Sequence, residues 1–400
     1  MPEASKEPKG PLAGMRVLDC THVIAGAWCS LLLADLGADV VKIEPPGGEV
    51  TRLSIGAFRA YDFVNRNKRA IAVDFAQPLG AEAVRRLANT ADVFVENFRP
   101  GVLDRMGLGY EDLRKGNPAL IYASVSGFGS TGPYRERGGL DLVAQAMSGI
   151  MSYTGEPDGA PMSAGVPLAD LNAGTFAALG VLAAWGHRLR TGEGQHVEAT
   201  LLESALAYTV WEAGIYLTTG EVAQRKGSRH RLASPYESFQ TRDGCMVVGV
   251  SNQRLWLRLC EVLGKPSLDE DVRFRDPISR LKHRDALRDE IEARLATQDT
   301  KSWVEKMVER GIPCGPVQDI AQALADPHVK ARGMLLQLGG RQFVGSPLRL
   351  SRTPAVVRRG PAEVGEHSRE VFLQAGFAAE EIDRLVEAGA LVEATRKNSP

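Results

Sequence analysis

Short apolar segments alternate with helical patterns over the first 130 residues. The segments predicted to be strands are 16–19, 39–44, 70–74, 92–96 and 119–126. Apolar side chains recur at helical spacing within 25–36, 78–88 and 110–115, which lie between those strands. This rhythm predicts a mostly parallel sheet in an open α/β fold. In such folds ligands bind beyond the carboxyl ends of the strands, so the segments that follow the strands are where a site is expected.

The pattern changes beyond residue 130. Residues 140–188 predict helices around a loop at 154–159, and residues 197–217 predict one long helix. Two β-rich segments, 237–241 and 245–249, flank Arg242-Asp-Gly244 and predict a hairpin. Charged helices are expected at about 253–263, 279–295 and 301–311, so that 228–330 forms a smaller α+β domain. In the tail, 345–350 is expected to be extended and 368–376 helical.

Composition excludes several classes of protein. Net charge is −1, which predicts neither a nucleic-acid partner nor a membrane surface. The five cysteines are scattered without a C-x-x-C, and the seven histidines lack metal-ligand spacing, so we expect no metal site and a reducing, cytoplasmic location. The N-terminus lacks the apolar core of a signal peptide, and apolar stretches such as 176–185 are short for a membrane span.

Asp170 is a carboxylate in an otherwise apolar and small run, Gly165-Val-Pro-Leu-Ala-Asp-Leu-Asn-Ala-Gly174. Burial of an unpaired carboxylate costs free energy and raises its pKa. Two interpretations are open. Asp170 caps the N-terminus of a helix of small residues, or it is a nucleophile that attacks an activated acyl group.

Motifs for common cofactors are absent. No G-x-G-x-x-G follows the first strand, and there is no P-loop or G-x-S-x-G. Gly127-Phe-Gly-Ser-Thr-Gly132 is either an anion cradle built from backbone N–H groups or a flexible turn.

Taken together, the ordered segments resemble one enzyme family. They are 17–26, 33–48, 65–69, 92–101 with 103–107, 124–129, 132–134, 165–174, 191–195, 311–316 and 365–367. Their order and spacing resemble the class III coenzyme A transferases, the family of formyl-CoA transferase and carnitine CoA-transferase. The resemblance spans about residues 12–390.

The resemblance implies that Asp170 is the nucleophile. It would attack an acyl-CoA thioester to form a mixed anhydride, and then an aspartyl-CoA thioester that an acceptor carboxylate resolves. CoA and acyl-CoA are then substrates, and no permanently bound cofactor is expected. The resemblance also implies a Rossmann-like large domain from 1–200 and 331–400, a linker at 201–227 and the small domain at 228–330. Two such subunits would interlock as a ring-like homodimer.

Other positions are matched to family roles. The resemblance implies that CoA is bound by His22, Val23, Ala25, Val73, Asn97, Phe98, Val102, Arg105 and Met106. It implies that five residues lie near the carboxylic acid substrate: Ile24, Leu140, Gly227, Arg229 and His230. Arg229, His230 or Arg231 would bind the second carboxylate of a dicarboxylic acid. Several have alternatives: His22 is otherwise a structural turn residue, Arg105 a solvated helix residue, and residues 229–231 an exposed basic turn. Asn67-Lys68-Arg69 either steers phosphates or forms a basic strand edge.

The pattern is closest to members that move CoA between dicarboxylic acids, with succinyl-CoA or a similar donor. Racemases related to this family carry a catalytic His where Leu140 stands, which counts against the alternative of an acyl-CoA racemase or isomerase. A non-catalytic CoA-binding subunit of a heteromer is the other alternative, and the presence of Asp170 argues against it.

Overall fold

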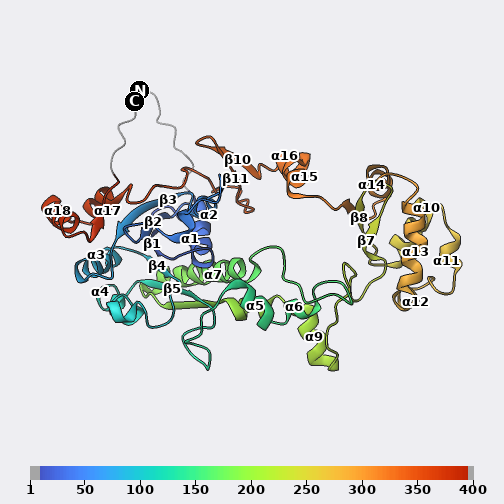
Figure 1. Cartoon of the computed structure of the whole chain (residues 1–400), viewed down its shortest axis with the longest axis horizontal. Helices are drawn as coiled ribbons and strands as arrows, with labels where there is room; N and C mark the ends of the chain where they lie inside the picture. Colours follow the sequence, from blue (N-terminus) through green and yellow to red (C-terminus); the bar gives the residue numbers. More distant parts are fainter. Residues whose placement is uncertain (1–9, 395–400) are drawn as a thin grey trace. The chain divides into compact units, whose positions relative to one another are not determined.

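The structure is a computed structural model that describes residues 10–394, and its largest sheet has seven strands (Figure 1). Its strand order is β12-β3-β2-β1-β4-β5-β6, and every neighbouring pair is parallel except β12 with β3. The bounds are β1 Arg16–Cys20, β2 Asp39–Glu44, β3 Lys68–Val73, β4 Val93–Glu96, β5 Ile121–Ser126, β6 His196–Thr200 and β12 Leu391–Val392. The predicted α/β class with a mostly parallel sheet is confirmed.

The strand order reverses between β1 and β4. From β1 the chain builds outward through β2 and β3, and then returns to place β4 on the other side of β1. The loops that leave β1 and β4 therefore lie side by side at the carboxyl edge of the sheet. In open α/β sheets this reversal point is where ligands bind.

Alternate residues of the strands point to opposite faces of the sheet. One face carries an apolar core in which Leu18, Ile71 and Phe94 pack against α3, α4, α17 and α18. The opposite face carries Asp19, Lys42 and Lys68, and the main chain of α1 lies close enough for Lys68 Nζ to donate to the Ala27 carbonyl at 2.9 Å. The face that α1 covers therefore carries a group of paired buried charges.

The helices of the first part of the chain connect these strands. They are α1 Ala25–Asp35, α2 Ala60–Val64, α3 Pro78–Ala88, α4 Tyr110–Gly116, α5 Asp141–Met147, α6 Ile150–Tyr153, α7 Leu168–Thr191, α8 Leu201–Ala207 and α9 Val210–Thr219, with 3₁₀ turns η1 Val50–Arg52 and η2 Asp104–Met106. Near the C-terminus lie the hairpin β10 Leu335–Leu338 and β11 Arg341–Val344, then α17 Ser368–Gln374 and α18 Ala379–Glu387.

The predicted single helix at 197–217 is wrong. Its first residues form strand β6, which pairs with β5 in parallel, and the rest forms two helices, α8 and α9. Thr200 ends the strand and caps α8, because its hydroxyl accepts the Glu203 N–H at 3.0 Å. Backbone pairing at the sheet edge therefore overrides the helical spacing.

A smaller expectation also fails. The predicted helix at 279–295 is two helices that meet at His283, the first capped by Asp276. Residues 345–350, expected to be extended, lie outside any helix or strand.

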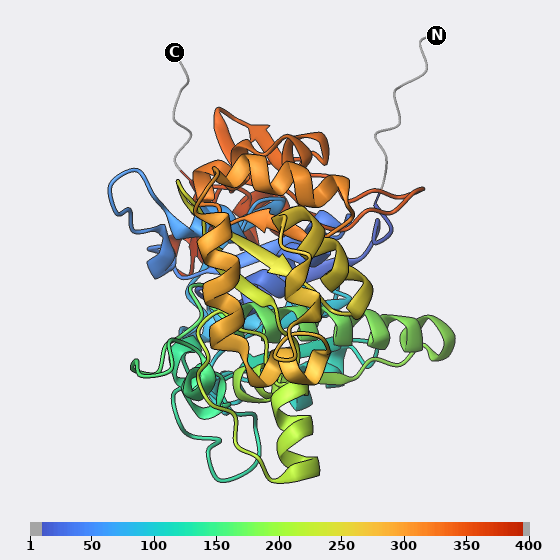
Figure 2. The same ribbon diagram turned by 90° about the vertical axis from the view of Figure 1, so that its right-hand side faces the viewer.

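The described chain divides into two compact units. The first comprises the residues up to Ile150, Ser163–Gly220 and Gly333 onward; the second comprises Met151–Met162 and Glu221–Arg332. The second unit contains the predicted hairpin, β7 Tyr236–Gln240 with β8 Cys245–Gly249, joined by β9 Cys314–Pro316 (Figure 2). Its helices are α10 Gln253–Leu263, α11 Ser267–Glu270, α12 Pro277–Lys282, α13 Arg284–Leu295, α14 Thr300–Glu309, α15 Ile320–Ala325 and α16 Pro327–Ala331. The domain boundaries expected from the resemblance stay a prediction.

Helix α7 is long and apolar enough to cross a membrane by length and composition alone. That is weak evidence, since a core helix meets the same criterion. Here Ala173, Ala177 and Val181 are buried, and a side chain added at Gly174 would collide with the Ala25 carbonyl of α1. The small residues therefore serve close packing between α7 and α1.

Candidate active site

Asp170 is the third residue of α7, so the interpretation as the N-cap is wrong. The N-cap position is held by Pro167, which has no side chain that can accept a hydrogen bond. The Asp170 carboxylate is partly buried, and it has no hydrogen bond or ion pair with any residue in the described part of the chain. Burial, with a contribution from the charge of Asp141, raises the pKa of Asp170 to about 6.

Asp141 holds the segment that carries Asp170. Its Oδ1 accepts the backbone N–H groups of Ala169 at 2.7 Å and Asp170 at 3.3 Å. Gln145, which is 1% exposed, donates from Nε2 to Asp141 Oδ2 at 2.6 Å, and its Oε1 accepts the N–H of Ala164 at 2.9 Å. Neither residue was predicted from the sequence to take part in the site. The sequence feature that could have indicated them is the spacing of Asp141 and Gln145, which are polar residues four positions apart directly after the matched residue Leu140.

The loop after β1 and the loop after β4 meet at the reversal point of the sheet. The His22 N–H donates to Asn97 Oδ1 at 2.7 Å, and Asn97 Nδ2 donates back to the His22 carbonyl at 2.7 Å. The rings of His22 and Phe98 make an edge contact with centroids 5.1 Å apart. Four residues matched to CoA binding, His22 and Val23 on one loop and Asn97 and Phe98 on the other, are therefore brought together.

Val23 and Ile24 lie between this junction and α7. Val23 has φ +63°, which is costly for a β-branched residue, and its side chain is 42% exposed. Ile24 precedes the first residue of α1, Ala25, whose carbonyl lies against Gly174, one turn along α7 from Asp170. The loop thus has an unusual conformation, and it leads directly into Ala25, which contacts α7 one turn from Asp170.

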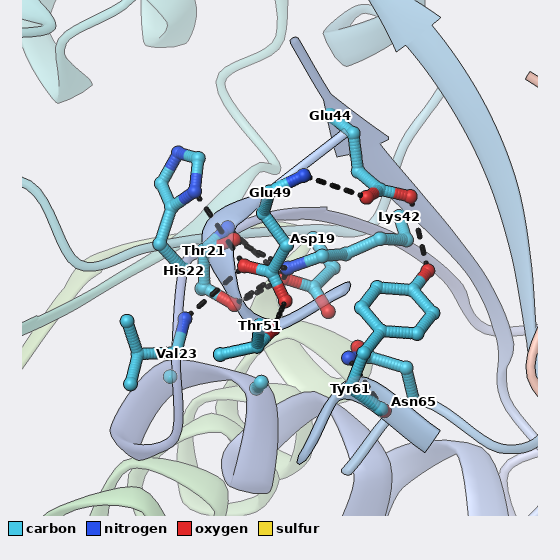
Figure 3. Close-up of polar contacts among 12 residues, drawn as sticks. Asp19, Thr21, His22, Val23, Lys42, Glu44, Glu49, Thr51, Tyr61 and Asn65 are labelled. Carbon is cyan, nitrogen blue, oxygen red and sulfur yellow. Dashed lines mark hydrogen bonds and ion pairs between the residues drawn. The ribbon is translucent and has the colours of Figure 1, made fainter. Parts of the chain in front are cut away.

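A buried ionic network fixes this loop (Figure 3). Glu49 Oε2 accepts the Val23 N–H at 3.1 Å and lies 3.5 Å from His22 Nδ1. Lys42, fully buried, bridges Glu49 at 3.7 Å and Asp19 at 3.6 Å, and also donates to the Thr21 carbonyl. Burial alone would raise the pKa of Glu49, but Lys42, His22 and neighbouring donors lower it to about 2. A charged carboxylate therefore reaches from the core to the strained loop.

Asp19 is the centre of the same network. It accepts hydrogen bonds from Ser30 Oγ at 2.6 Å and Lys68 Nζ at 2.8 Å. Burial would raise the pKa of this carboxyl, but Lys42 and Lys68 hold it well below its usual range. Asp19 and Lys42 were given no role from the sequence, although a charge inside an apolar strand is a sign that it is paired.

A cavity of about 300 Å³ opens beside Asn97 and Phe98. Its wall includes the guanidinium-bearing residues Arg99, Arg135 and Arg137 and no acidic residue, and it reaches Leu140, which is 73% exposed and precedes Asp141. Arg99 makes no ion pair with the residues described, and Arg137 lies over the Tyr134 ring at 3.8 Å. The cavity is suited to an anionic ligand.

The other residues predicted to bind CoA differ in how far their side chains are exposed. Arg105 is exposed and, within residues 10–394, has no ion pair, so it is free to contact a phosphate; Val102 and Met106 beside it are partly buried. Val73 is 1% exposed in the core, so its side chain is not available to a ligand.

The interpretation of Asn67, Lys68 and Arg69 as phosphate-steering residues is wrong. All three are buried and engaged: Asn67 with Asp35, Lys68 with Asp19, and Arg69 with Asp39 at 2.6 Å. They are internal partners of carboxylates on neighbouring elements.

Two N–H groups of 127–132 are already occupied within the protein. The Gly129 N–H donates to Ser126 Oγ, and the Ser130 N–H donates to Glu198 Oε1 at 2.7 Å. These two contacts support the alternative of a turn, which is tied to β6, and the anion cradle stays a prediction.

Gly227, Arg229 and His230 lie in the second unit. Gly227 has φ +62°, and an added side chain would contact the Glu156 carboxylate. Arg229 pairs with Glu237 and Asp285, and His230 stacks on Tyr236 with centroids 4.8 Å apart. Arg231 pairs with Glu221. The basic residues of this turn therefore already have partners within their own unit.

No cluster of His, Cys, Asp or Glu suited to a metal ion occurs among the residues that the structure describes. The five cysteines, all in the described range, are free thiols.

Comparison with known proteins decides the family. The profile of CoA-transferase family III matches residues 12–368. The chain belongs to CoA-transferase family III. Succinate–glutarate CoA-transferase of Agrobacterium fabrum is 38% identical over 383 residues, which cover 92% of this chain and 96% of that protein. Acetyl-CoA:oxalate CoA-transferase of Acetobacter aceti is 40% identical over 351 residues, covering 86% and 90%.

A solved structure agrees with this assignment. A CAIB/BAIF family protein from Brucella suis has a TM-score of 0.84 and 35% identity, and the match covers 92% of this chain and all of that one. The predicted enzyme class is confirmed: the chain is a CoA-transferase, and CoA thioesters are the substrates of such enzymes.

Proposed function

We propose that this CoA-transferase moves CoA from an acyl-CoA to a carboxylic acid through covalent chemistry at Asp170. One observation carries the proposal: a partly buried carboxylate with a raised pKa and no partner among the described residues stands in the first turn of α7. A carboxylate without a stabilising cation or donor remains a strong nucleophile.

The reaction then proceeds by four exchanges. An Asp170 oxygen attacks the donor thioester carbon, which forms a mixed anhydride and releases CoA thiolate. The thiolate attacks the Asp170 carbonyl, which forms aspartyl-CoA and releases the donor acid. The acceptor carboxylate attacks aspartyl-CoA, which forms a second anhydride and releases thiolate. The thiolate attacks the acceptor carbonyl, which forms the new acyl-CoA and regenerates the Asp170 carboxylate. No proton is transferred, so no general base is needed.

The loops at the strand reversal would bind CoA. Arg99, Arg105 and Arg137 are guanidinium groups without carboxylate partners among the described residues, and they suit the phosphates and the acid substrate. The loop at His22–Val23, held by Glu49 and Asn97, would support the thioester end. No permanently bound cofactor is required.

The acids are proposed to be dicarboxylic, with succinyl-CoA or a similar donor. Relatives at 35–40% identity include succinyl-CoA:mesaconate CoA-transferase of Haloarcula hispanica and succinyl-CoA:glutarate CoA-transferase of Mus musculus. The cavity wall with three arginines fits a doubly charged acid.

An acceptor panel tests this substrate class. The purified chain is incubated with succinyl-CoA and, separately, acetate, oxalate, glutarate, mesaconate and citramalate, and acyl-CoA products are separated by chromatography. We expect transfer to at least one dicarboxylic acid, with kcat/KM at least about tenfold above that for acetate, because a second charge–guanidinium contact is worth about 1.4 kcal/mol or more. Preference for acetate would contradict the proposal.

A separate incubation of the purified chain with a 2-methylacyl-CoA distinguishes the racemase alternative. In deuterated water a 2-methylacyl-CoA would gain deuterium at its α-carbon under a racemase. We expect no exchange above the buffer blank, because position 140 holds Leu and no base.

We also propose a homodimer, supported by helix α9. None of its residues is buried, and its large apolar side chains Val210, Trp211 and Leu217 are 69%, 68% and 82% exposed. Such a surface is unusual for a free monomer and suits a subunit interface. Light scattering on the eluted protein should give twice the 43.2 kDa chain mass, and Trp211→Glu with Leu217→Glu should reduce the dimer fraction. A monomeric wild type would contradict this assembly.

A further inference from the structure

The first turn of α7 presents an electrostatic problem for its nucleophile. The first N–H groups of a helix have no acceptor inside the helix, and they attract anions. Asp170 is the third residue of α7, where a carboxylate can interact with those same groups. Such an interaction would stabilise the charge of Asp170 and reduce its reactivity.

Asp141 occupies those groups instead. Its Oδ1 accepts the N–H groups of Ala169 and Asp170, at 2.7 and 3.3 Å. A negative charge is thereby placed at the helix N-terminus, where it offsets the positive end of the helix dipole. The carboxylate of Asp170 is left without a donor among the described residues.

Gln145 fixes Asp141 in this position. Both lie on α5 one turn apart, and Gln145 Nε2 donates to Asp141 Oδ2 at 2.6 Å and to the Val166 carbonyl at 3.3 Å. Gln145 Oε1 accepts the N–H of Ala164 at 2.9 Å. Two side chains of one helix thus fix both the approach to α7 and its first turn.

We propose that Asp141, held by Gln145, is a positioning residue that keeps the Asp170 carboxylate unpaired and reactive by taking the helix N-terminal donors for itself. This rests on the proposed role of Asp170 and adds the group that sets its reactivity.

Asp141 is the residue to substitute in a test of the charge around Asp170. Within the described chain, Asp141 is the charged residue that acts on the pKa of Asp170. The titratable side chains of the other elements packed on α7 are buried or engaged elsewhere: Cys29 and Asp35 of α1, Tyr122 of β5, His196 and Glu198 of β6, and Glu203 of α8.

The first test is the pH dependence of kcat/KM for the donor acyl-CoA. The nucleophile is the ionised form, so wild-type activity should fall as the pH falls through about 6. Asp141→Asn keeps an acceptor oxygen but removes the charge, so the pKa of Asp170 should fall and the acid limb should move to lower pH. Above pH 7 we expect kcat to fall about tenfold with KM for acyl-CoA unchanged within about twofold, because a less basic carboxylate is a weaker nucleophile.

A second measurement does not depend on activity. Carbon-13 NMR of aspartate-labelled protein, with Asp170→Asn used to assign the resonance, reports the titration of Asp170 directly. We expect a midpoint near pH 6 in the wild type and a lower midpoint in Asp141→Asn. If the Asp141 variant does not fold, Gln145→Met provides the test: it releases Asp141, so the midpoint should shift in the same direction.

The outcomes separate the two ideas. An unchanged acid limb and an unchanged NMR midpoint in the folded variants would overturn the role of Asp141. The NMR midpoint of Asp170 could differ between Asp141→Asn and wild type while the wild type forms no covalent intermediate on Asp170. That result would support the electrostatic role of Asp141 and refute Asp170 as the nucleophile.

Discussion

Substitution of Asp170 by Asn is expected to lower kcat for CoA transfer by a factor on the order of 10⁴ or more, the scale seen when a covalent nucleophile is removed. An amide cannot form the anhydride, and the nearest described carboxylate, Asp141, is engaged by two N–H groups and Gln145. Steady-state assays with the preferred donor and acceptor measure the loss. Asp170→Ala should behave the same way and controls for deamidation of the Asn variant.

The stability of the same variant separates a functional from a structural role. A capping aspartate would contribute to helix stability, and its loss would lower Tm. Asp170 has no partner in residues 10–394 and its ionisation is disfavoured by burial, so Asp170→Asn should keep or raise Tm at pH 8. Asp289→Asn, at an exposed position on α13, is the matched control. A large fall in Tm together with the loss of activity would indicate that Asp170 is structural.

Asp19→Ala is expected to reduce the free energy of unfolding by about 3–5 kcal/mol, the scale for removing one partner of a buried ion pair. Two buried ammonium groups, Lys42 and Lys68, depend on this carboxylate. Urea denaturation followed by circular dichroism measures the change. Loss of the central anion should also loosen the Thr21–Val23 loop, because Lys42 holds the Thr21 carbonyl and Glu49.

Two comparisons control for this effect. Asp289→Ala removes an exposed carboxylate and should change stability by less than about 0.5 kcal/mol. Asp19→Asn keeps the side-chain volume and part of the hydrogen bonding, so it should fall between wild type and Asp19→Ala. If Asp19→Ala is as stable as Asp289→Ala, the network in Figure 3 does not stabilise the fold.

The sequence predicted strands β1 to β5 well, because each contains an apolar run and most are separated by helical patterns, but it did not predict β6 or β12. It failed where a tertiary partner decides the structure. Residues 197–200 form a strand because β5 offers an edge for pairing, which local spacing cannot reveal. The helix was predicted there from local periodicity alone. The observed strand forms because it pairs with β5, some 70 residues earlier in the chain.

The candidate site divides in the same way. The importance of Asp170 was visible in an apolar run, and the resemblance supplied its chemistry. The roles of Lys68 and Arg69 were misjudged because their carboxylate partners, Asp19 on β1 and Asp39 on β2, come from other strands of the sheet, and sequence alone does not pair them. Asp141 was missed because its i, i+4 spacing to Gln145 marks a polar pair but does not reveal a contact with a helix that begins 27 residues later.

Intact-protein mass spectrometry tests the central claim most directly. Wild type and Asp170→Asn are mixed with succinyl-CoA, and the masses are recorded before and after addition of an acceptor acid or hydroxylamine. We expect a CoA-sized adduct on the wild type alone, located on the peptide that contains Asp170, and discharged by the acceptor with formation of a new acyl-CoA. Transfer at the wild-type rate by Asp170→Asn, or an adduct on another residue, would contradict the account.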